Sequence, residues 1–536
     1  MCGIFAYLTN GKFTEFSENY IKIIKENGMN NNKRGPDNTI DLFINDKIYM
    51  MFHRLCINDL SINGNQPMSF KNYYLICNGE IFNHREIINR YYFKTETKSD
   101  CEVILHLYHY LKNENTNDIM GNLCNILDGE FSFILYDYDD CKTFIARDPY
   151  GVRPLFIGRT ENEDIVFSSE LKGLQNLCYK AEQFKPGQYM KIYLDNSFII
   201  NKYHSISYIS INTEYNIILK KLNFYFRNAV YKRMMSDKEV CSLLSGGLDS
   251  SLVSAILSEK MGPYRLKTFA IGIKGSPDLK NAQIVADHIK SNHYNIELTE
   301  EEFLNAIPEV IYKIESYDTT TVRASVGNYL VAKYIKENTE CKVVFNGDYA
   351  DEVCGGYKYF KKSPTDSEFH NECLRLIDDI HYYDSLRSDR CISTNGLEGR
   401  VPFADKFFID YFMSIPIKYR ISNNCLEKLI LRKAFENDNL LPENVLFRPK
   451  EAFSDGVTSE KRSWYKIIQE HVDKIITDEE FNLKKNHYEN NKPILKESFY
   501  YRKIFETNFK GFDNVIPYFW MPKWSNNIND PSAREL

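Results

Sequence analysis

The stretch Leu243-Leu244-Ser245-Gly246-Gly247-Leu248-Asp249-Ser250-Ser251 decides the fold of the carboxyl-terminal part of the chain. Apolar residues precede its glycines over 239–244, as in a buried strand, and a helical pattern follows over 251–260. Glycines let backbone N–H groups and a helix N-terminus approach a phosphate, and the serine hydroxyls add donors. The spacing is not that of a Walker loop, because the sequence contains no G-x-x-x-x-G-K-[ST] pattern. The stretch therefore predicts a strand, a phosphate-binding loop and a helix.

The sequence around this stretch repeats the order of strand and helix. A strand-like run at 266–273 precedes Ser276-Pro277-Asp278, which has the cap residue and the first-turn proline of a helix start. A helical pattern at 328–338 then precedes a strand-like run at 342–346. Alternating strands and helices are typical of a parallel sheet with crossover helices. We therefore expect an α/β parallel-sheet domain over residues 215–536.

The first part of the chain has a different pattern, with short runs rich in β-branched and aromatic residues. These runs lie at 48–52, 73–77, 131–138, 142–147 and 164–168. Helical patterns interrupt them at 16–26 and 101–113. The pattern predicts two layers of sheet flanked by helices, in an α+β domain over residues 2–190. A polar stretch without a clear period, 191–214, is the expected linker.

Composition narrows the class of protein. The chain has 536 residues, of which 43% are hydrophobic, and its formal net charge is −6, so we expect a folded, soluble protein without the basic surplus of nucleic-acid binders. No apolar run approaches the roughly 20 residues that span a bilayer, and the first residues lack the pattern of a signal peptide. The 13 cysteines form no C-x-x-C pair, which indicates neither a disulfide framework nor a zinc site. We expect a protein of the reducing cytoplasm with no membrane or nucleic-acid partner.

Cys2 is a candidate nucleophile. The small side chain of cysteine favours removal of Met1, which leaves a thiol and a free α-amine on one residue. Because an α-amine titrates near about 7.7 to 8.0, it can take the thiol proton at neutral pH. This pairing is the logic of N-terminal nucleophile enzymes.

Five motifs follow Cys2 in order, and together they strengthen the interpretation of Cys2 as a nucleophile. They are Lys33-Arg34-Gly35-Pro36-Asp37, His53-Arg54-Leu55-Cys56-Ile57, Asn78-Gly79-Glu80-Ile81-Phe82-Asn83-His84, Ser99-Asp100-Cys101-Glu102 and Ala146-Arg147-Asp148-Pro149-Tyr150-Gly151-Val152-Arg153-Pro154-Leu155. The ordered series resembles the class II glutamine amidotransferase domain. The resemblance implies an αββα sandwich of the N-terminal nucleophile type.

The same resemblance implies a role for each motif. Cys2 would attack the side-chain amide of glutamine, while Asn78 and the N–H of Gly79 would form the oxyanion hole. Arg54 would hold the α-carboxylate and Asp100 the α-amine. The rest of the expected glutamine site is Leu55, Cys56, Ile57, Asn58 and Glu80.

Each of these residues also has a simpler interpretation when it is taken alone. Arg54 and Asp100 could form a surface ion pair, and Asn78-Gly79 could be a hairpin turn. The ordered set as a whole favours the glutamine site.

The stretch at 245–250 resembles the PP-loop, S-G-G-x-D-S, of ATP pyrophosphatases, which have an adenine nucleotide alpha hydrolase-like fold. Together with the first domain it resembles the glutamine-hydrolysing asparagine synthetases. Further resembling segments are 269–272, 275–278, 317–325, 351–352, 355–357, 398–403 and 448–456. That family forms asparagine from aspartate, ATP and glutamine through β-aspartyl-AMP, releasing AMP, pyrophosphate and glutamate. Ammonia passes between its two sites through an internal tunnel.

This second resemblance implies ATP as a substrate and Mg²⁺ as a cofactor, with small-molecule substrates and a homodimer. Asp249 and Asp351 would hold Mg²⁺ with the pyrophosphate, and Asp348 would act in forming the intermediate. Thr321 and Arg323 would bind aspartate. The expected nucleotide site is Leu243, Ser245, Gly246, Gly247, Asp249, Ser250, Ile271, Asn346, Gly347 and Lys450.

One loop departs from the family. Residues 346–352 read Asn-Gly-Asp-Tyr-Ala-Asp-Glu where the family reads S-G-E-G-S-D-E. Asp348 keeps the carboxylate but is one methylene shorter, which retracts the charge by about 1.5 Å. Tyr349 stands at a glycine position, so the loop changes shape if that position requires a positive φ. The departure leaves three alternatives open: a glutaminase alone, a PP-loop amidotransferase with another carboxylate substrate, and a non-catalytic relative.

Overall fold

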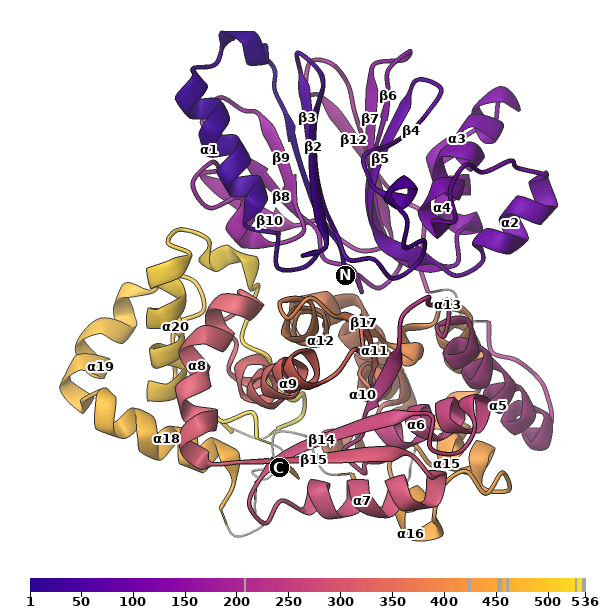
Figure 1. Cartoon of the computed structure of the whole chain (residues 1–536). Helices are drawn as coiled ribbons and strands as arrows, with labels where there is room; N and C mark the ends of the chain where they lie inside the picture. Colours follow the sequence, from indigo (N-terminus) through magenta and orange to yellow (C-terminus); the bar gives the residue numbers. More distant parts are fainter. Residues whose placement is uncertain (207–208, 422–425, 451–455, 459–461, 526–527, 533–536) are drawn as a thin grey trace.

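The computed structural model describes residues 1–206, 209–421, 426–450, 456–458, 462–525 and 528–532. Two parts of the chain are stacked on each other, a pair of facing sheets above and an α/β part below (Figure 1). The expected fold class, an α+β sandwich followed by a parallel-sheet domain, is confirmed. Within the described residues, no helix has the length and apolar character needed to cross a membrane.

The amino-terminal part consists of two antiparallel six-stranded sheets. The first has the order β10 (Lys180–Gln183), β8 (Phe156–Arg159), β9 (Ile165–Ser168), β1 (Gly3–Leu8), β3 (Ile48–Arg54) and β2 (Asn38–Asn45). The second has the order β12 (Phe198–Lys202), β11 (Gln188–Ile192), β7 (Lys142–Arg147), β6 (Gly129–Asp137), β5 (Tyr73–Ile81) and β4 (Met68–Phe70). Helix α1 covers the first sheet, and α2, α3 and α4 cover the second (Figure 1): Glu18–Met29, His84–Tyr91, Val103–Asn113 and Ile119–Ile126.

Strand β1 shows why the sandwich forms. Successive side chains of a strand point to opposite faces, so Ile4 and Leu8 pack between the two sheets while Phe5 and Tyr7 pack toward α1. Every residue of β1 is buried. Cys2 precedes this fully buried strand, which fixes its position at the end of the sandwich nearest the second domain.

The expected linker is wrong in its first half. The structure places 198–202 in β12, which pairs with β11 in the second sheet, with Ile192 opposite Phe198. All five residues of β12 are exposed at the edge of the sheet, so the strand shows no alternation of buried and exposed positions. The amino-terminal domain therefore extends past residue 190.

The carboxyl-terminal part contains a parallel five-stranded sheet. Its order is β15 (Asn292–Leu298), β14 (Lys267–Ile273), β13 (Val240–Leu243), β16 (Val343–Phe345) and β17 (Glu398–Arg400). Strand β13 pairs with β14 on one side and with β16 on the other. In open parallel sheets a crevice forms at such a reversal, outside the carboxyl ends of the strands. The loops after β13 and β16 therefore lie beside each other.

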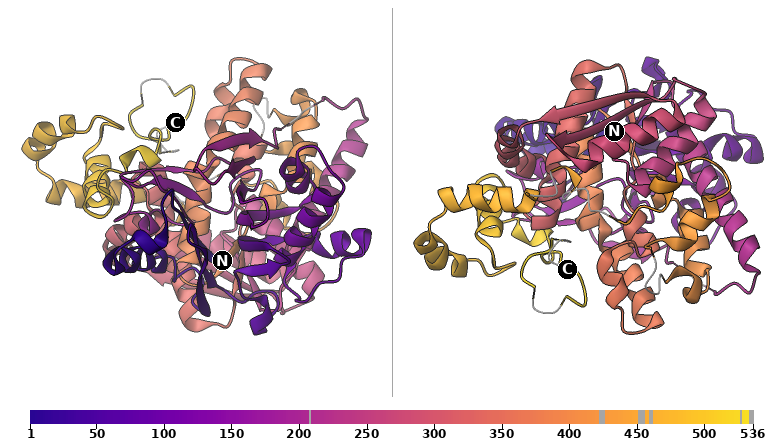
Figure 2. Two further views of the ribbon diagram at one scale, coloured as in Figure 1. Left: turned by 90° about the horizontal axis from the view of Figure 1, so that it is seen from above. Right: turned by 90° about the horizontal axis from the view of Figure 1, so that it is seen from below.

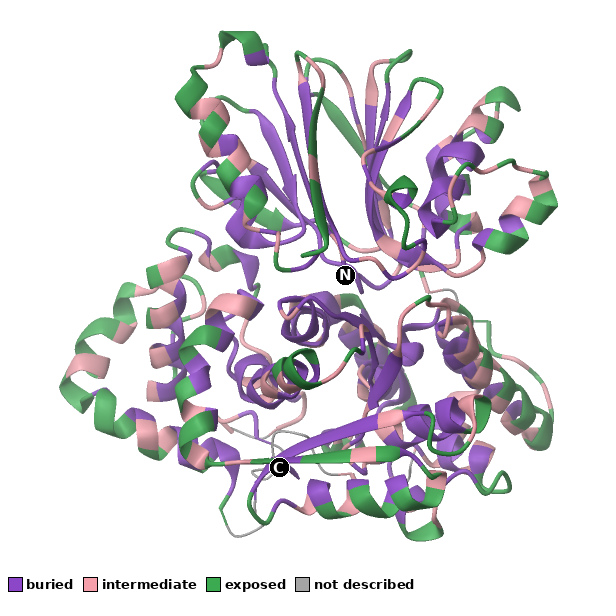
Figure 3. Ribbon diagram, viewed as in Figure 1, coloured by how far each residue is buried: buried purple, intermediate pink, exposed green. Residues whose placement is uncertain are grey.

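Most of the remaining described chain is helical. The main helices are α5 (Tyr215–Lys232), α6 (Leu248–Met261), α7 (Pro277–Ile289), α8 (Glu300–Ile314), α9 (Thr319–Asn338), α10 (Ala350–Cys354), α11 (Asp366–Asp379), α12 (Asp384–Ser393), α13 (Lys406–Ser414), α14 (Ile417–Arg420), α15 (Leu429–Phe435), α16 (Glu443–Leu446), α18 (Trp464–Ile475), α19 (Asp478–Lys484) and α20 (Lys496–Asn508). Helices α18 to α20 form a group at one side of the molecule, as both views of Figure 2 show. Figure 3 shows α12 buried and α19 largely exposed.

Charged side chains join the two parts in a buried interface. The guanidinium of Arg34 pairs with Asp389 on α12, and that of Arg153 lies 3.0 Å from Glu130 and donates to the carbonyl of Gly399 at 3.1 Å. These side chains are almost completely buried. Because a buried charge is stable only when paired, the interface fixes the two parts against each other.

Candidate active sites

The thiol of Cys2 lies against the loop that follows β3. The backbone N–H of Leu55 points at its sulfur, with 3.5 Å between the two atoms, and the sulfur lies 3.8 Å from the carbonyl oxygen of Leu55. Burial raises the pKa of the Cys2 thiol to about 12. A thiol with that pKa is protonated at neutral pH, so a base must take its proton before it can attack.

Met1 still precedes Cys2 in the described chain. Its ammonium donates a hydrogen bond to the carbonyl of Leu397, at 3.0 Å, and burial lowers its pKa to about 6. The chain end therefore lies between the two domains, and the amine next to the thiol becomes that of Cys2 once Met1 is removed.

Asn78 has a side-chain amide with no partner. It lies on β5, which contacts β1, and both Nδ2 and Oδ1 are buried without a hydrogen bond to any described residue. A buried amide without a partner is unfavourable unless a ligand completes it. At the next residue, Gly79, an added Cβ would lie 2.4 Å from the carbonyl oxygen of Glu130, so only glycine fits.

Asn58 joins two acidic side chains. Its Nδ2 donates to Glu80 and, at 3.4 Å, to Asp100, whose other carboxylate oxygen accepts from the backbone N–H of Ile81 at 2.6 Å. Burial raises the pKa of both carboxyls, and for Glu80 the neighbouring Asp100 raises it further. A bound ammonium group would relieve this repulsion.

Arg54 is held by the loop that follows it. Its Nη1 donates to the carbonyl of Ser61 at 2.5 Å and to Asn65 at 2.9 Å, and Nη2 donates to the carbonyl of Asp59. Among the described residues no ion pair joins Arg54 to Asp100, and both side chains are buried. The interpretation as a surface ion pair is therefore wrong.

The remaining loop residues of the expected glutamine site are arranged by backbone hydrogen bonds. The N–H of Cys56 donates to Asp37 at 2.8 Å, and the carbonyl of Ile57 accepts from the N–H of Asp237 at 3.0 Å. Leu55 and Ile57 are buried in the apolar cluster shared with the second domain.

The phosphate-loop stretch lies between β13 and α6, as the sequence predicts. The hydroxyl of Ser250 accepts from the backbone N–H of Ser245 at 3.1 Å, and the two serine hydroxyls are 3.0 Å apart. Gly246 has a φ of 72°, and an added Cβ would lie 2.4 Å from Asn281. The glycine thus allows the tight turn that joins β13 to the N-terminus of α6, the end of a helix at which phosphate groups bind.

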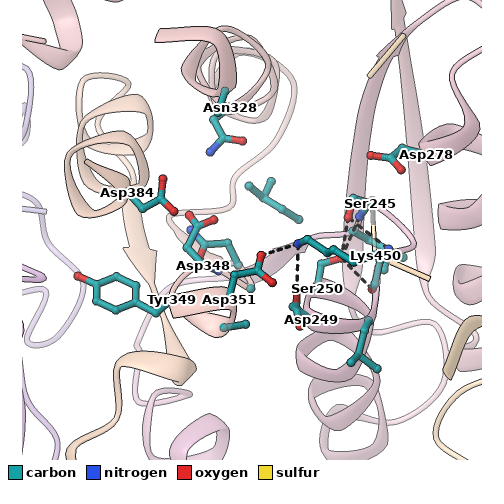
Figure 4. Close-up of a pocket in the computed structure, with 18 of the residues that line it drawn as sticks. Ser245, Asp249, Ser250, Asp278, Asn328, Asp348, Tyr349, Asp351, Asp384 and Lys450 are labelled. Atoms are coloured by element: carbon teal, nitrogen blue, oxygen red, sulfur yellow. Dashed lines mark hydrogen bonds and ion pairs between the residues drawn. The ribbon is translucent and has the colours of Figure 1, made fainter. Parts of the chain in front are cut away.

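Two lysines neutralise the acidic residues beside this loop, and Figure 4 shows one of them, Lys450, with Asp249 and Asp351. The Nζ of Lys428 lies 2.6 Å from carboxylate oxygens of both Asp249 and Asp351, and the Nζ of Lys450 lies between the same two carboxylates. Burial raises the pKa of Asp351, but Lys428 and Lys450 outweigh it and hold that pKa well below its usual range.

The acidic pair fits a magnesium site. Two carboxylates that converge on one cation give the hard oxygen ligands that Mg²⁺ prefers, and Mg²⁺ in nucleotide sites is bound by one or two carboxylates plus phosphate oxygens. Among the described residues, however, no group of three or more His, Cys, Asp or Glu side chains could hold a metal alone. Phosphate oxygens would have to complete the coordination.

Asp348 lies on the opposite wall of the crevice. One of its oxygens accepts from Arg387 at 2.7 Å, and the other is buried with no partner among the described residues. Arg387 also donates to Asp384 at 3.3 Å. Burial raises the pKa of Asp348 although Arg387 opposes the shift.

The neighbours of Asp348 hold the loop after β16. Asn346 accepts from the N–H of Asp348 at 3.1 Å and donates to Ser388 at 2.8 Å. At Gly347 an added Cβ would lie 2.7 Å from the backbone nitrogen of Ser250, so this glycine lets the two loops touch.

These groups surround one cavity of about 200 Å³. Nine of the ten predicted nucleotide residues line it, together with Asp348 and Asp351: Leu243, Ser245, Gly247, Asp249, Ser250, Ile271, Asn346, Gly347 and Lys450. The tenth, Gly246, is not part of the wall. Further lining residues that the sequence analysis assigned no role are Asp278, Asn328, Asp384, Arg387, Lys428 and Arg448.

The structure does not bring Arg323 to this cavity. Its guanidinium pairs with Glu497 at 2.6 Å and with Asp530 at 2.8 Å. Arg323 and Glu497 are buried, and Asp530 is half-buried. Thr321 hydrogen-bonds Asp318 at the start of α9 and also lies off the cavity wall. Thr321 lines a smaller pocket that shares Thr320, Glu352, Tyr357 and Asp384 with the nucleotide cavity. The predicted aspartate contacts of Thr321 and Arg323 stay predictions.

Lys428 and Arg387 are the main site residues that sequence reasoning missed. Lys428 lies outside every quoted motif and reaches Asp249 from 179 residues away. Arg387 lies on α12 among other charged residues. No local pattern marks either one, and the only usable signal is the excess of acidic side chains at 249, 348 and 351, which requires cations nearby.

Comparison with known proteins gives two matching family models. The family model described as a glutamine amidotransferase domain matches residues 1–215. The model described as asparagine synthase matches residues 221–366 and 361–525.

Relatives match over the whole chain. The glutamine-hydrolyzing asparagine synthetase of Homo sapiens is 41% identical over 570 aligned residues, covering 100% of this chain and 98% of the relative. The enzyme of the same name from Cricetulus griseus is 41% identical, and that from Gallus gallus is 40% identical, each with the same coverage.

Proposed function

The chain belongs to the glutamine-hydrolysing asparagine synthetases, and from that premise we propose which of its residues carry the reaction. It forms L-asparagine from L-aspartate in an ATP-dependent reaction, with glutamine as the amide donor. The chemistry divides into hydrolysis of glutamine in the first domain and activation of aspartate in the second.

In the first domain, the Cys2 sulfur attacks the side-chain carbonyl carbon of glutamine. With Met1 removed, the α-amine of Cys2 takes the thiol proton, which the pKa of the buried thiol makes necessary. The oxyanion is stabilised by the amide of Asn78 and the N–H of Gly79. Ammonia leaves with the proton from the amine, and water then cleaves the thioester to give glutamate. The observation that carries this assignment is the buried amide of Asn78, which has no partner among the described residues.

Recognition of glutamine follows from charge. Glu80 and Asp100, linked by Asn58, provide negative charge for the α-ammonium group. Arg54 provides the positive charge for the α-carboxylate, and its contacts with the 59–65 loop fix its position.

In the second domain, ATP occupies the cavity between the loops after β13 and β16. The loop from Ser245 to Ser250 and the start of α6 receive phosphate oxygens. Asp249 and Asp351 would hold Mg²⁺, which would offset phosphate charge and assist departure of pyrophosphate. Lys428 and Lys450 turn from these carboxylates toward the phosphates when the nucleotide binds.

The aspartate β-carboxylate attacks the α-phosphorus of ATP and gives β-aspartyl-AMP and pyrophosphate. Ammonia then attacks the activated carbonyl, AMP leaves, and a proton is released. Asp348 faces this chemistry with one carboxylate oxygen free of described partners, and Arg387 holds the other. We assign Asp348 to the intermediate-forming step, with Arg387 as its positioning residue.

One assay tests the whole assignment. The Met1-processed protein is incubated with aspartate, ATP, Mg²⁺ and glutamine, and asparagine, glutamate and pyrophosphate are measured together. We expect asparagine and pyrophosphate in equal amounts. A Cys2→Ala variant should lose this activity with glutamine and keep it with ammonia. Glutamate without asparagine or pyrophosphate would contradict the assignment and favour a glutaminase alone.

The setting of the enzyme completes the proposal. The described cysteines are all free thiols, which supports a reducing, cytoplasmic location. A homodimer is proposed on the resemblance to the family, and sedimentation of the purified protein tests it.

A further inference from the structure

A small second cavity lies between the two domains. It has a volume of about 10 Å³, close to the space that one water molecule needs, and ammonia is of similar size. Its wall combines residues of both domains: Met1, Val152 and Arg153 from the first, and Tyr349, Ser385, Ser388, Asp389, Gly399 and Val401 from the second.

Tyr349 lies between this interdomain cavity and the nucleotide cavity. It lines both cavities, and no other residue of the 346–352 loop does. Figure 4 shows its ring pointing away from the cluster of Asp249, Asp351 and Lys450. The ring is 1% exposed and belongs to the apolar cluster that also contains Leu55, the residue in contact with the Cys2 thiol.

The hydroxyl of Tyr349 hydrogen-bonds that of Ser385 on α12. This bond and the packed ring hold the side chain in one position, at the residue that immediately precedes α10. The backbone is also unusual, since Tyr349 has a φ of 75°. A bulky residue adopts a positive φ only where its surroundings over-determine it, and such positions concentrate at functional sites.

We propose that Tyr349 is a gate between the two active sites: its ring closes the end of the interdomain cavity, its bond to Ser385 latches it, and ammonia reaches the nucleotide cavity only when the ring swings aside. The inference rests on the proposed function, since it assumes that ammonia released at Cys2 is consumed beside Asp348. A buried cavity suits this cargo, because a weakly solvated space disfavours the ammonium ion relative to ammonia.

If Tyr349 is a gate, freeing its ring and enlarging its ring should have opposite effects on the transfer of ammonia. The measured quantity is the ratio of asparagine to glutamate formed with glutamine as the nitrogen source, at saturating ATP and aspartate. Each variant's ammonia-dependent rate is measured in parallel to correct for damage to the nucleotide cavity. We expect a ratio below one for the unaltered enzyme, because the latched ring slows transfer.

Two mild variants release the latch. Ser385→Ala and Tyr349→Phe remove its two hydroxyls in turn and should each raise the corrected ratio toward its upper limit of one. Tyr349→Trp enlarges the ring and should lower the corrected ratio at least fivefold. As a matched control, Tyr359→Phe removes another buried tyrosine hydroxyl, which donates to Glu372 at 2.8 Å, and should leave the ratio unchanged because Tyr359 lines neither cavity.

The outcomes separate the gate from the function. If the unaltered enzyme makes no asparagine from ammonia, the proposed function fails and the gate fails with it. If it makes asparagine, but its ratio already equals one or the latch variants leave the ratio unchanged, the gate alone is overturned. If Tyr349→Trp misfolds, the two latch variants still test the gate, because each removes only a single oxygen atom.

Discussion

Arg34 and Asp389 form a two-point ion pair across the domain interface, with Nη1 2.7 Å from Oδ2 and Nη2 3.0 Å from Oδ1. Arg34 also contacts Glu170 at 3.2 Å, and its Nε donates to the carbonyl of Cys2 at 2.9 Å. A single side chain therefore connects the nucleophile's backbone to α12 of the second domain.

Loss of this pair should destabilise the whole protein. Arg34→Ala leaves Asp389 buried and unpaired, and we expect the free energy of unfolding to fall by about 3–5 kcal/mol. Urea unfolding followed by fluorescence measures the change. The control is Arg462→Ala, which breaks an exposed pair with Glu300 and should lower stability by no more than about 1 kcal/mol. Equal losses in the two variants would contradict the role assigned to the buried pair.

Asn78→Ala should impair glutamine hydrolysis selectively. Removal of one oxyanion donor typically lowers kcat by about 100- to 1000-fold, and we expect a loss in that range for glutamate formation. The ammonia-dependent rate of asparagine formation, measured on the same sample, reports whether the second domain is intact. Asn72→Ala changes an exposed asparagine before the same strand and should behave as the unaltered enzyme. A glutaminase rate within threefold of normal for Asn78→Ala would falsify the assignment.

Lys428→Met should impair the second domain instead. The variant leaves Asp249 and Asp351 with Lys450 alone, and we expect ATP-dependent pyrophosphate release to fall about 100-fold, as for other lost electrostatic contacts to a reacting group. A coupled pyrophosphate assay with ammonia and aspartate measures it. Lys433→Met changes an exposed lysine on the adjacent helix α15 and serves as the control. The idea fails if both variants release pyrophosphate at the same rate.

The acidic pair near Asn58 predicts the pH dependence of glutamine use. Burial, followed by Asp100, raises the pKa of Glu80 well above its usual range, so this carboxylate loses its charge at a higher pH than an ordinary glutamate does. Since the pH dependence of kcat/KM reports groups of the free enzyme, kcat/KM for glutamine should decline on the acid side. Glu80→Gln should move that decline to lower pH, whereas Glu86→Gln, an exposed change on α2, should not.

The same raised pKa has a consequence for stability with a definite sign. A carboxyl whose folded-state pKa exceeds its unfolded value favours folding when it is protonated. The contribution of Glu80 is therefore fully present below the ordinary carboxyl pKa and is lost as the pH rises through the folded-state pKa. Comparison of Glu80→Gln with the unaltered protein across this range should show the largest gain in stability at high pH.

Arg323→Ala tests the predicted role of Arg323 in aspartate binding against its role in the ion-pair cluster. The change leaves Glu497 buried without its cation, so we expect a loss of about 3–5 kcal/mol of stability. The KM for aspartate, measured below the unfolding temperature, should remain normal. Arg387→Ala, which removes the partner of Asp348, should instead lower the ammonia-dependent rate. A raised KM in Arg323→Ala alone would favour the role in aspartate binding.

Much of the fold could be predicted because its signals are local. The strand, loop and helix around Gly246 lie where the sequence predicts them, since the apolar run, the glycines and the helical pattern are contiguous. The runs at 48–52 and 142–147 correspond to β3 and β7 for the same reason. Strand β12 escaped prediction because it lies at an exposed edge, where burial imposes no alternation.

The parts of the site that escaped prediction depend on contacts between distant residues. Lys428 and Arg387 are surface-like in sequence, and only the tertiary fold brings them to Asp249 and Asp348. Arg323 is the converse case: it lies in a family-like segment, and the structure pairs its guanidinium with Glu497 and Asp530, which no local pattern indicates. Composition and motif spacing predict the chemistry of a site more reliably than they predict which lysine or arginine side chain completes it.

The position of Met1 has a consequence for how the enzyme matures. Its amine bonds to Leu397, a residue made almost four hundred positions later, and the side chain is 1% exposed, so no aminopeptidase could reach it in the folded protein. Use of glutamine through Cys2 therefore requires that the methionine is removed before the two domains close over it. A molecule that folds before this cleavage would keep its first residue for life and remain a synthetase that can use only free ammonia.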